Sequence, residues 1–435
     1  MRKHLVLAGL ATLVFIALTW GMHFPLMADD YIFALKAYDP SFSLGAFETL
    51  LVKRPLASLV NFTLLKFDLF NSQMLGFYLF FFLHSLGLLG IIKWMSDRLN
   101  PASLQGPVKS AGIKIGFEPF LIMLCLYPCL HEVLYMRLSA PYSLGIVFLA
   151  LMLYSTSIWS RVLWMFCAFS LFETFVIPAL LLPFVPDLFD FLVRRQVPNV
   201  RKVFQHSVAW VMALGCYFIL RYALSIYVPS TSYQLDFSLF HLFSQVKQNL
   251  SLLWTIHFFK EYWVLSLLEW LVILTSLFYF PGENRRKWVF ALMLLVVPFV
   301  ASAQALLINY YAPRAVYGGV ILKIVLLGCV FKGFASRADR EFCKVAVLAL
   351  LCCVYVNQSM RVFAIKSSNF EVLATKEAAW IEKMQNCAEP CSLVMGNLAQ
   401  DLHQDWVLPP FVYQSYLKWV QLRHGITKQI EFKLN

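Results

Sequence analysis

The chain has 435 residues, of which 60% are hydrophobic and only 14% are charged, and its mean hydropathy is +0.68. This composition excludes an ordinary soluble globular domain, in which about 25% of the residues are charged. The formal net charge of +12 would fit a nucleic-acid-binding protein. The basic residues, however, gather in short clusters between apolar runs, which is typical of cytoplasmic loops in membrane proteins and argues against that function.

Apolar runs long enough to cross a bilayer, about 20 residues each, recur along the whole chain. The first run follows Met1-Arg2-Lys3-His4, as in a signal peptide, but no small-residue cleavage site comes after it. We therefore interpret it as a retained signal-anchor with the N-terminus in the cytoplasm. The sequence predicts an all-α polytopic protein of about 11 spans, at residues 5–22, 73–94, 114–131, 141–159, 162–173, 175–193, 204–226, 262–281, 287–308, 315–332 and 343–358.

Basic clusters mark the loops that we place in the cytoplasm. They are Arg2/Lys3, Lys93/Arg98/Lys109/Lys114, Arg161, Arg194/Arg195/Arg201/Lys202, Arg285/Arg286/Lys287 and Lys332/Arg337/Arg340/Lys344. The weakest assignment is 162–193, because two spans must fit into 32 residues. Two short helices broken at prolines would do so, whereas one span with a re-entrant piece would invert the topology of everything that follows.

Three segments then lie on the outer, periplasmic side. Residues 23–72 form a long first loop in which apolar and polar residues mix at helical spacing, which predicts helices lying on the membrane. Residues 227–261 form a second large loop. The tail, residues 359–435, is predicted to be a small periplasmic C-terminal domain that follows a membrane module of residues 1–358. This places the C-terminus outside the cytoplasm.

Cys387 and Cys391 are the two cysteines of this tail, and they flank Ala388-Glu389-Pro390. An oxidising compartment would permit a short disulfide between them. A metal site would need further ligands, and no Cys or His with suitable spacing lies near. We therefore predict the disulfide.

Asp29 and Asp30 form an acidic pair directly after the first span, in a chain that is poor in acids. Two adjacent carboxylates at a membrane surface repel each other and attract cations, so the pair indicates a function. The alternative is a helix cap, because Asp is favoured at N-caps and residues 31–38 could form the helix.

The arrangement of Ala28-Asp29-Asp30-Tyr31, then Lys53-Arg54-Pro55-Leu56, then the apolar run from Leu75, resembles the GT-C superfamily of integral-membrane glycosyltransferases. The chain is most similar to bacterial O-antigen glucosyltransferases, which modify lipopolysaccharide and convert serotype. The resemblance implies a GT-C-like bundle in the bacterial inner membrane. It also implies a hexosyltransferase that moves a hexose, expected to be glucose, from undecaprenyl phosphate to the O-antigen on the periplasmic face.

By this resemblance Asp29 or Asp30 is the general base of an inverting transfer. An acceptor hydroxyl that attacks the anomeric carbon must lose its proton, and a carboxylate beside the lipid-carried sugar could take it. The other carboxylate would orient the acceptor or bind a divalent metal, if the reaction uses one. The sequence names no certain cofactor, and the expected partners are the polyprenyl-phosphate-linked sugar, the lipopolysaccharide acceptor and membrane lipid.

The leaving phosphate needs cations, and Arg suits phosphate because it donates two parallel hydrogen bonds. Arg314, with Tyr317 beside it at the start of the tenth span, resembles the Arg/Tyr pattern before a late helix in several GT-C enzymes. Arg54 with Lys53 is the second candidate pair, and Arg221 is a weaker one. The alternative for each arginine is snorkelling to the interface.

Four further residues are substrate-binding candidates on chemical grounds. Arg137 follows His131-Glu132 in the turn between the third and fourth spans, and Glu173 is an acid in an apolar stretch. His131 and Glu132 could also ligate a metal, but adjacent residues on a helix point in different directions. Glu269, inside the eighth span, could be a functional acid of the same kind or could equally pair with a neighbouring helix.

Two other functions remain open from the sequence. A transporter or flippase for a lipid-linked saccharide would carry charges in a central cavity and often shows repeated halves, whereas the ionisable residues here are predicted to gather at one membrane face. An O-antigen polymerase would also use outer arginines, but it would not require the Asp pair.

Overall fold

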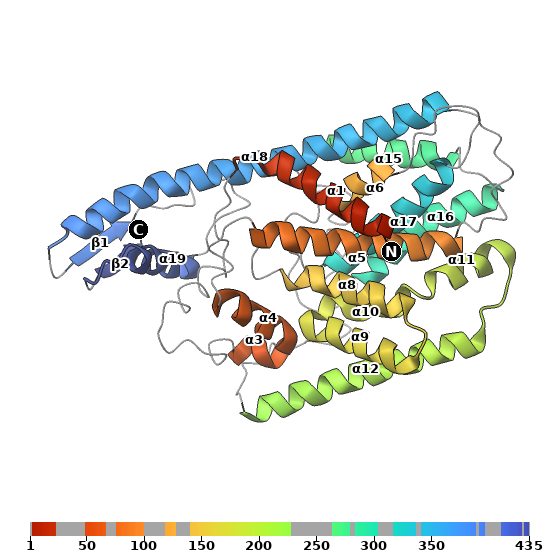
Figure 1. Cartoon of the computed structure of the whole chain (residues 1–435), viewed down its shortest axis with the longest axis horizontal. Helices are drawn as coiled ribbons and strands as arrows, with labels where there is room; N and C mark the ends of the chain where they lie inside the picture. The colour runs from red at the N-terminus through yellow and green to blue at the C-terminus, as the bar shows by residue number, and fades with distance from the viewer. Residues whose placement is uncertain are drawn as a thin grey trace, which may run out of the picture.

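The computed structural model describes residues 2–22, 48–66, 75–99, 118–127, 140–227, 263–278, 283–302, 316–335, 341–388, 391–395, 410–428 and 430–434. In these ranges the chain is mostly helical, as the composition predicts (Figure 1). The helices are α1 (Arg2–Thr19), α3 (Glu48–Lys53), α4 (Pro55–Lys66), α5 (Leu75–Leu99), α6 (Glu118–Cys125), α8 (Pro141–Tyr154), α9 (Ile158–Leu171), η5 (Glu173–Phe175), α10 (Val176–Leu181), α11 (Val185–Arg194), α12 (Val200–Tyr227), α15 (Trp263–Phe278), α16 (Asn284–Ala301), α17 (Tyr317–Ala335), α18 (Glu341–Asn386) and α19 (Pro410–Arg423).

Each range predicted to span the membrane overlaps one of these helices. Within the described residues, six helical stretches are long and apolar enough to cross a bilayer: Arg2–Thr19, Gly76–Leu99, Glu173–Val193, Val200–Tyr227, Tyr317–Phe334 and Val347–Asn386. Shorter apolar helices cover Pro141–Tyr154, Ile158–Leu171 and Ser266–Phe278. The chain is therefore a polytopic, mostly helical membrane protein, while the expected number of about 11 crossings stays a prediction.

The stretch 162–193 is not one continuous helix, because it contains most of α9, then η5, α10 and most of α11. Phe172 is extended, with φ −151° and ψ 137°, so it ends α9, and η5 begins at the next residue. α10 then packs back against α9 and α12. That two spans cross the membrane here stays a prediction, and Glu173 lies at the point where the chain turns.

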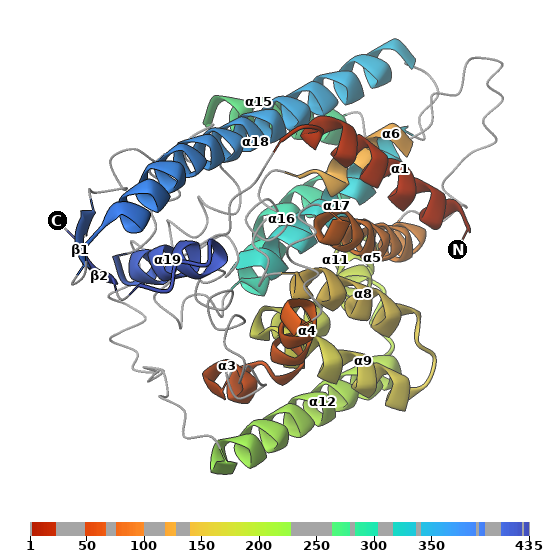
Figure 2. The same ribbon diagram turned by 60° about the vertical axis from the view of Figure 1, so that its left-hand side comes forward.

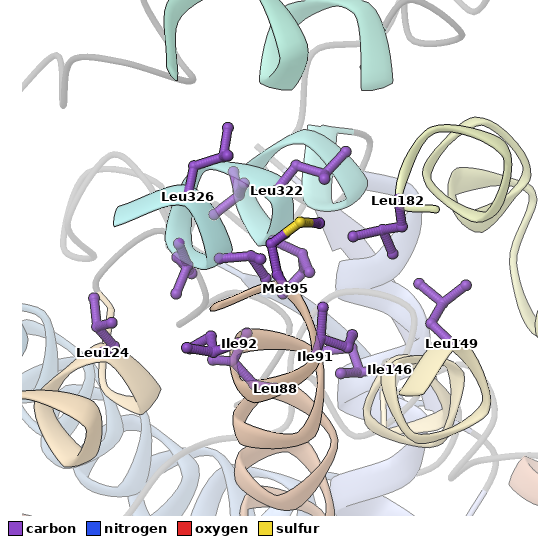
Figure 3. Packing of buried hydrophobic residues seen from close by; sticks show 14 of the residues in the cluster. Leu88, Ile91, Ile92, Met95, Leu124, Ile146, Leu149, Leu182, Leu322 and Leu326 are labelled. Atoms are coloured by element: carbon purple, nitrogen blue, oxygen red, sulfur yellow. The ribbon is translucent and has the colours of Figure 1, made fainter. Parts of the chain in front are cut away.

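α17 lies at the centre of the bundle, where it packs against α5, α15 and α16. Figure 3 shows Leu322 and Leu326 of α17 over Leu88, Ile92 and Met95 of α5. All five side chains are buried in one large hydrophobic cluster. In a membrane such contacts stabilise the bundle through close van der Waals packing, so α17 is a fixed reference for the helices around it.

α12 lies at the periphery and has the opposite character. Val211, Phe218 and Ile219 are among several large apolar side chains that it leaves exposed. Figure 1 shows α12 along one side of the molecule and α18 along the other. A helix that exposes such side chains fits a hydrocarbon surrounding and not water.

The tail has a small hydrophobic cluster of its own, separate from that of the bundle. It joins the last third of α18 to α19 through side chains such as Trp380, Tyr416 and Val420. α18 runs without a break through residues 358 and 359, so the predicted domain boundary lies inside this helix. Cys387 and Cys391 form the disulfide that the sequence predicts.

Two short strands in the tail were not part of the all-α prediction. β1 (Cys391–Met395) pairs in parallel with β2 (Ile430–Leu434), and Cys391 lies opposite Ile430. Residues 430–434 alternate apolar and polar side chains, which is the period-two pattern of a half-buried strand. The strand signal was therefore present, but it was short.

Of the predicted outer segments, α3, α4 and the described part of the tail lie away from the N-terminus. In Figure 1, α3, α4 and the tail are on the left, and the N-terminus is towards the right. Figure 2, turned by 60°, likewise separates the tail from the N-terminus. At the N-terminal end Asp97 binds Lys93 at 2.6 Å and Lys332 at 3.3 Å, which joins the C-terminal parts of α5 and α17.

Candidate functional site

The structure describes four of the predicted site residues: Lys53, Arg54, Glu173 and Tyr317. The other six lie outside the described residues, and their roles stay predictions: Asp29, Asp30, His131, Glu132, Arg137 and Arg314. The structure therefore gives the geometry of the part of the site that contains Lys53 and Arg54.

Arg54 and Glu173 form an ion pair, although 119 positions separate them in the chain. Arg54 lies between α3 and α4, because a residue before proline is disfavoured in a helix and Pro55 starts the next one. Its Nε donates to Glu173 Oε2 at 2.9 Å, and its guanidinium lies 4.9 Å from the centre of the Phe172 ring. The chain turn between α9 and α10 thus meets the segment between α3 and α4 at this pair.

Arg221 adds a second guanidinium from α12. It lies 4.0 Å from Glu173 Oε1, and its Nη1 donates to the Tyr217 hydroxyl at 3.3 Å. Tyr217 and Arg221 are four residues apart and therefore share one helix face. The carboxylate of Glu173 consequently lies between two guanidinium groups that come from different segments.

Tyr217 ties this helix face to the first loop. Its hydroxyl is 2.7 Å from the Lys53 carbonyl oxygen and 3.4 Å from Glu173 Oε1. A phenol has one proton to donate, so the shorter contact to the backbone carbonyl takes it. Tyr217 was not predicted, and its position four residues before Arg221 was the only sequence signal for it.

The electrostatics of the cluster are dominated by cations. Three basic side chains, Lys53, Arg54 and Arg221, act on one carboxylate, that of Glu173. Burial, together with the charges of Arg221 and Arg54, lowers the pKa of Lys53. Burial alone would also lower the pKa of Arg54, but the Glu173 carboxylate raises that pKa above its ordinary value. Two guanidinium groups, of Arg54 and Arg221, therefore face the one carboxylate of Glu173.

Tyr317 lies behind the cluster and not in it. Its side chain is fully buried, and its hydroxyl is 3.0 Å from His84 Nδ1. Its ring packs edge-on against Tyr142 at 5.0 Å, and Tyr142 stacks on Phe172 at 3.6 Å. The predicted contact of Tyr317 with substrate stays a prediction, because in this structure Tyr317 supports the aromatic layer on which Arg54 rests.

Two glycines fix the turn that carries Glu173. A Cβ at Gly318 of α17 would lie 2.5 Å from the Thr174 carbonyl oxygen, and one at Gly145 of α8 would overlap the Phe175 ring. Both helices therefore approach η5 as closely as their backbones allow. This packing holds Glu173 opposite Arg54 and Arg221.

A second polar cluster lies wholly inside the bundle. Lys323 of α17 and Glu269 of α15 form an ion pair at 3.2 Å, and neither side chain is exposed. The Tyr127 hydroxyl donates to the same Glu269 oxygen at 2.8 Å. Of the two alternatives for Glu269, the structure shows the pairing with a neighbouring helix. Lys323 was missed, although it is a single charge in a long apolar run, which itself marks a functional candidate.

Within the ranges that the structure describes, no group of three or more His, Cys, Asp or Glu side chains could hold a metal ion. The predicted metal ligands, Asp29 or Asp30 and His131 with Glu132, fall outside those ranges.

Comparison of the chain with family models, with curated proteins and with solved structures gives no match. The function must therefore be argued from the residues and their geometry.

Proposed function

We propose that the protein is a membrane glycosyltransferase of the GT-C type. It would move a hexose, with glucose as the expected sugar, from undecaprenyl phosphate to the O-antigen of lipopolysaccharide. The proposal puts this reaction at the periplasmic face of the bacterial inner membrane. The observation that carries it is the meeting of Lys53, Arg54 and Arg221 around Glu173, next to the loop in which the sequence has its acidic pair.

The proposed chemistry uses the two halves of the site for different tasks. The acceptor oxygen forms a bond to the anomeric carbon while the bond from that carbon to the phosphate oxygen breaks. Asp29 or Asp30 takes the acceptor proton, and the lipid phosphate leaves with the electron pair. Arg54 and Arg221 stabilise the charge on the leaving phosphate, because guanidinium groups bind phosphate oxygens through paired donors.

The position of the cluster supports this assignment. Arg54 sits between two short helices of the first predicted periplasmic loop, and Arg221 is near the end of α12. A lipid phosphate would lie at that level, because its hydrocarbon tail stays in the bilayer while its sugar remains in water. The aromatic rings of Phe172 and Tyr217 beside the guanidiniums fix their directions.

Transfer by the purified protein in lipid vesicles tests the proposal. Undecaprenyl phosphate carrying a labelled hexose is supplied with lipopolysaccharide, and label in the lipopolysaccharide is measured. Arg54→Gln and Arg221→Gln are expected to lose most transfer, whereas Arg201→Gln keeps it, because Arg201 is exposed at the opposite end of α12. Equal transfer by all three variants would contradict a phosphate site at this cluster.

A lipid-linked saccharide transporter is the second candidate, and one observation favours it. Lys323 and Glu269 form a buried ion pair between α17, which is long and apolar enough to cross a membrane, and the shorter apolar helix α15, and transporters carry intramembrane charges of this kind. The vesicle assay separates the two functions. A transporter would carry the labelled lipid across the bilayer without moving label to lipopolysaccharide, and a transferase would do the reverse.

A further inference from the structure

The Glu173 carboxylate occupies the place that an anionic ligand would take. One of its oxygens is 2.9 Å from Arg54 Nε, and the other is 4.0 Å from Arg221 Nη1. The same second oxygen is 3.4 Å from the Tyr217 hydroxyl. Two guanidiniums around two oxygens is also the pattern in which proteins hold phosphate.

The two guanidiniums are held by groups other than Glu173. Arg54 lies on the Phe172 ring, which is stacked on Tyr142 and so cannot tilt freely. Arg221 lies 5.6 Å from the Tyr217 ring, and its Nη1 also donates to the Tyr217 hydroxyl. The cations would therefore keep their positions if the carboxylate moved away.

Glu173 itself can move without disturbing the turn. Its backbone carbonyl accepts from the Val176 amide, so the main chain is fixed within η5. Its side chain is 32% exposed, and the side chains of Arg54 and Arg221 are 36% and 31% exposed. Ion pairs that are partly exposed contribute less than fully buried ones, because water competes for both partners and long side chains lose rotational freedom.

We propose that Glu173 is an internal occupant of the anion site, which the phosphate of the lipid donor displaces. This inference rests on the proposed function, since it takes the ligand to be a lipid-carried phosphate. When the phosphate binds between Arg54 and Arg221, the carboxylate turns outward and the guanidiniums exchange one anion for another. Glu173 thereby sets the affinity for the donor, and its carboxylate neutralises Arg54 and Arg221 when no phosphate is bound.

Binding of undecaprenyl phosphate to the detergent-solubilised protein tests the displacement. Glu173→Gln keeps the size of the side chain and removes the competing charge. Undecaprenyl phosphate should therefore bind to this variant about two- to fivefold more tightly than to the wild type. Glu173→Asp keeps the charge but is one methylene too short to reach both guanidiniums. Glu173→Asp should therefore also bind undecaprenyl phosphate more tightly than the wild type does, although its net charge is the same. An effect of net charge alone would not produce this result.

Matched probes identify the ligand and the site. Undecaprenol, which lacks phosphate, should bind equally to the wild type and to Glu173→Gln, and inorganic phosphate should not compete at the same concentration as the lipid. Glu377→Gln is the control variant, because Glu377 pairs with Arg423 and His424 in the tail. It should leave binding unchanged. Competition by equimolar inorganic phosphate would contradict a lipid-borne ligand.

The outcomes distinguish the displacement of Glu173 from the phosphate site itself. Weaker or unchanged binding by Glu173→Gln, with binding still lost in Arg54→Gln, would overturn the displacement but leave the phosphate site standing. If neither Arg54→Gln nor Arg221→Gln changed the binding of undecaprenyl phosphate, the phosphate site would be overturned, and with it the proposed function. Elution of each variant as the same monodisperse species on size exclusion shows that it is folded.

Discussion

Breaking the buried Lys323–Glu269 pair should strongly destabilise the bundle. Both side chains are completely buried, at 3.2 Å from each other, and Glu269 also accepts from Tyr127. Lys323→Met removes the cation and leaves a carboxylate in an apolar interior. Removal of one partner of such a pair costs about 3–5 kcal/mol, because the remaining charge keeps its desolvation cost without compensation.

The double variant Lys323→Met with Glu269→Gln should recover much of this loss. The amide oxygen of Gln can still accept the Tyr127 hydrogen bond, and no uncompensated charge remains. Lys332→Met on the same helix is the matched control. Lys332 is 33% exposed and binds Asp97 at 3.3 Å, so its loss should cost at most about 1 kcal/mol.

Denaturant titration in mixed micelles measures these differences as free energies of unfolding, and the double-mutant cycle gives the coupling of the pair. The reasoning predicts that Lys323→Met unfolds at much lower denaturant than Lys332→Met, with the double variant in between. It would be refuted if the two single Lys variants were equally stable, or if the double variant were less stable than Lys323→Met alone.

Three further predictions concern the cationic cluster. Tyr217→Phe removes the hydroxyl donor to the first loop and should cost about 0.5–1.5 kcal/mol in thermal stability and donor binding, whereas Tyr222→Phe, at an exposed position, should cost nothing measurable. Gly318→Ala drives a methyl into the backbone of η5 and should cost about 1–3 kcal/mol and much of the transfer activity; Gly215→Ala, where the added methyl meets no atom, should be silent. Because the pKa of Lys53 is lowered, this side chain loses its charge at a lower pH than an ordinary lysine does. Donor affinity should therefore decrease as the pH rises through the pKa of Lys53, and Lys53→Arg, which keeps its charge, should show no such decrease. The same pH dependence in the wild type and in Lys53→Arg would contradict this.

The helices were predictable because apolar runs of membrane-spanning length determine them almost alone. The predicted end of the membrane module at residue 358 stays a prediction, because α18 continues through that residue with no proline or glycine there. β1 and β2 were missed for a different reason, since five-residue strands give a weak periodic signal.

The candidate site was predictable as a set of residues but not as an arrangement. Arg54 and Glu173 were named from their chemistry, and their pairing across 119 positions depends on how tightly η5 packs against Gly318. From the sequence, Tyr217 looks like any aromatic residue in a lipid-facing helix. Only the structure shows that its hydroxyl accepts a hydrogen bond from Arg221. Lys323 could have been found by the rule that places a partner beside every intramembrane charge.

The mass of lipopolysaccharide from cells with and without the protein tests the central claim most directly. We predict one additional hexose on each O-antigen repeat when the wild-type protein is present. The increment should disappear with Asp29→Asn, with Asp30→Asn or with both, while these variants still insert into the membrane. A changed chain length with unaltered repeat mass would indicate a polymerase instead. An undiminished hexose increment with both variants would contradict catalysis by the acidic pair.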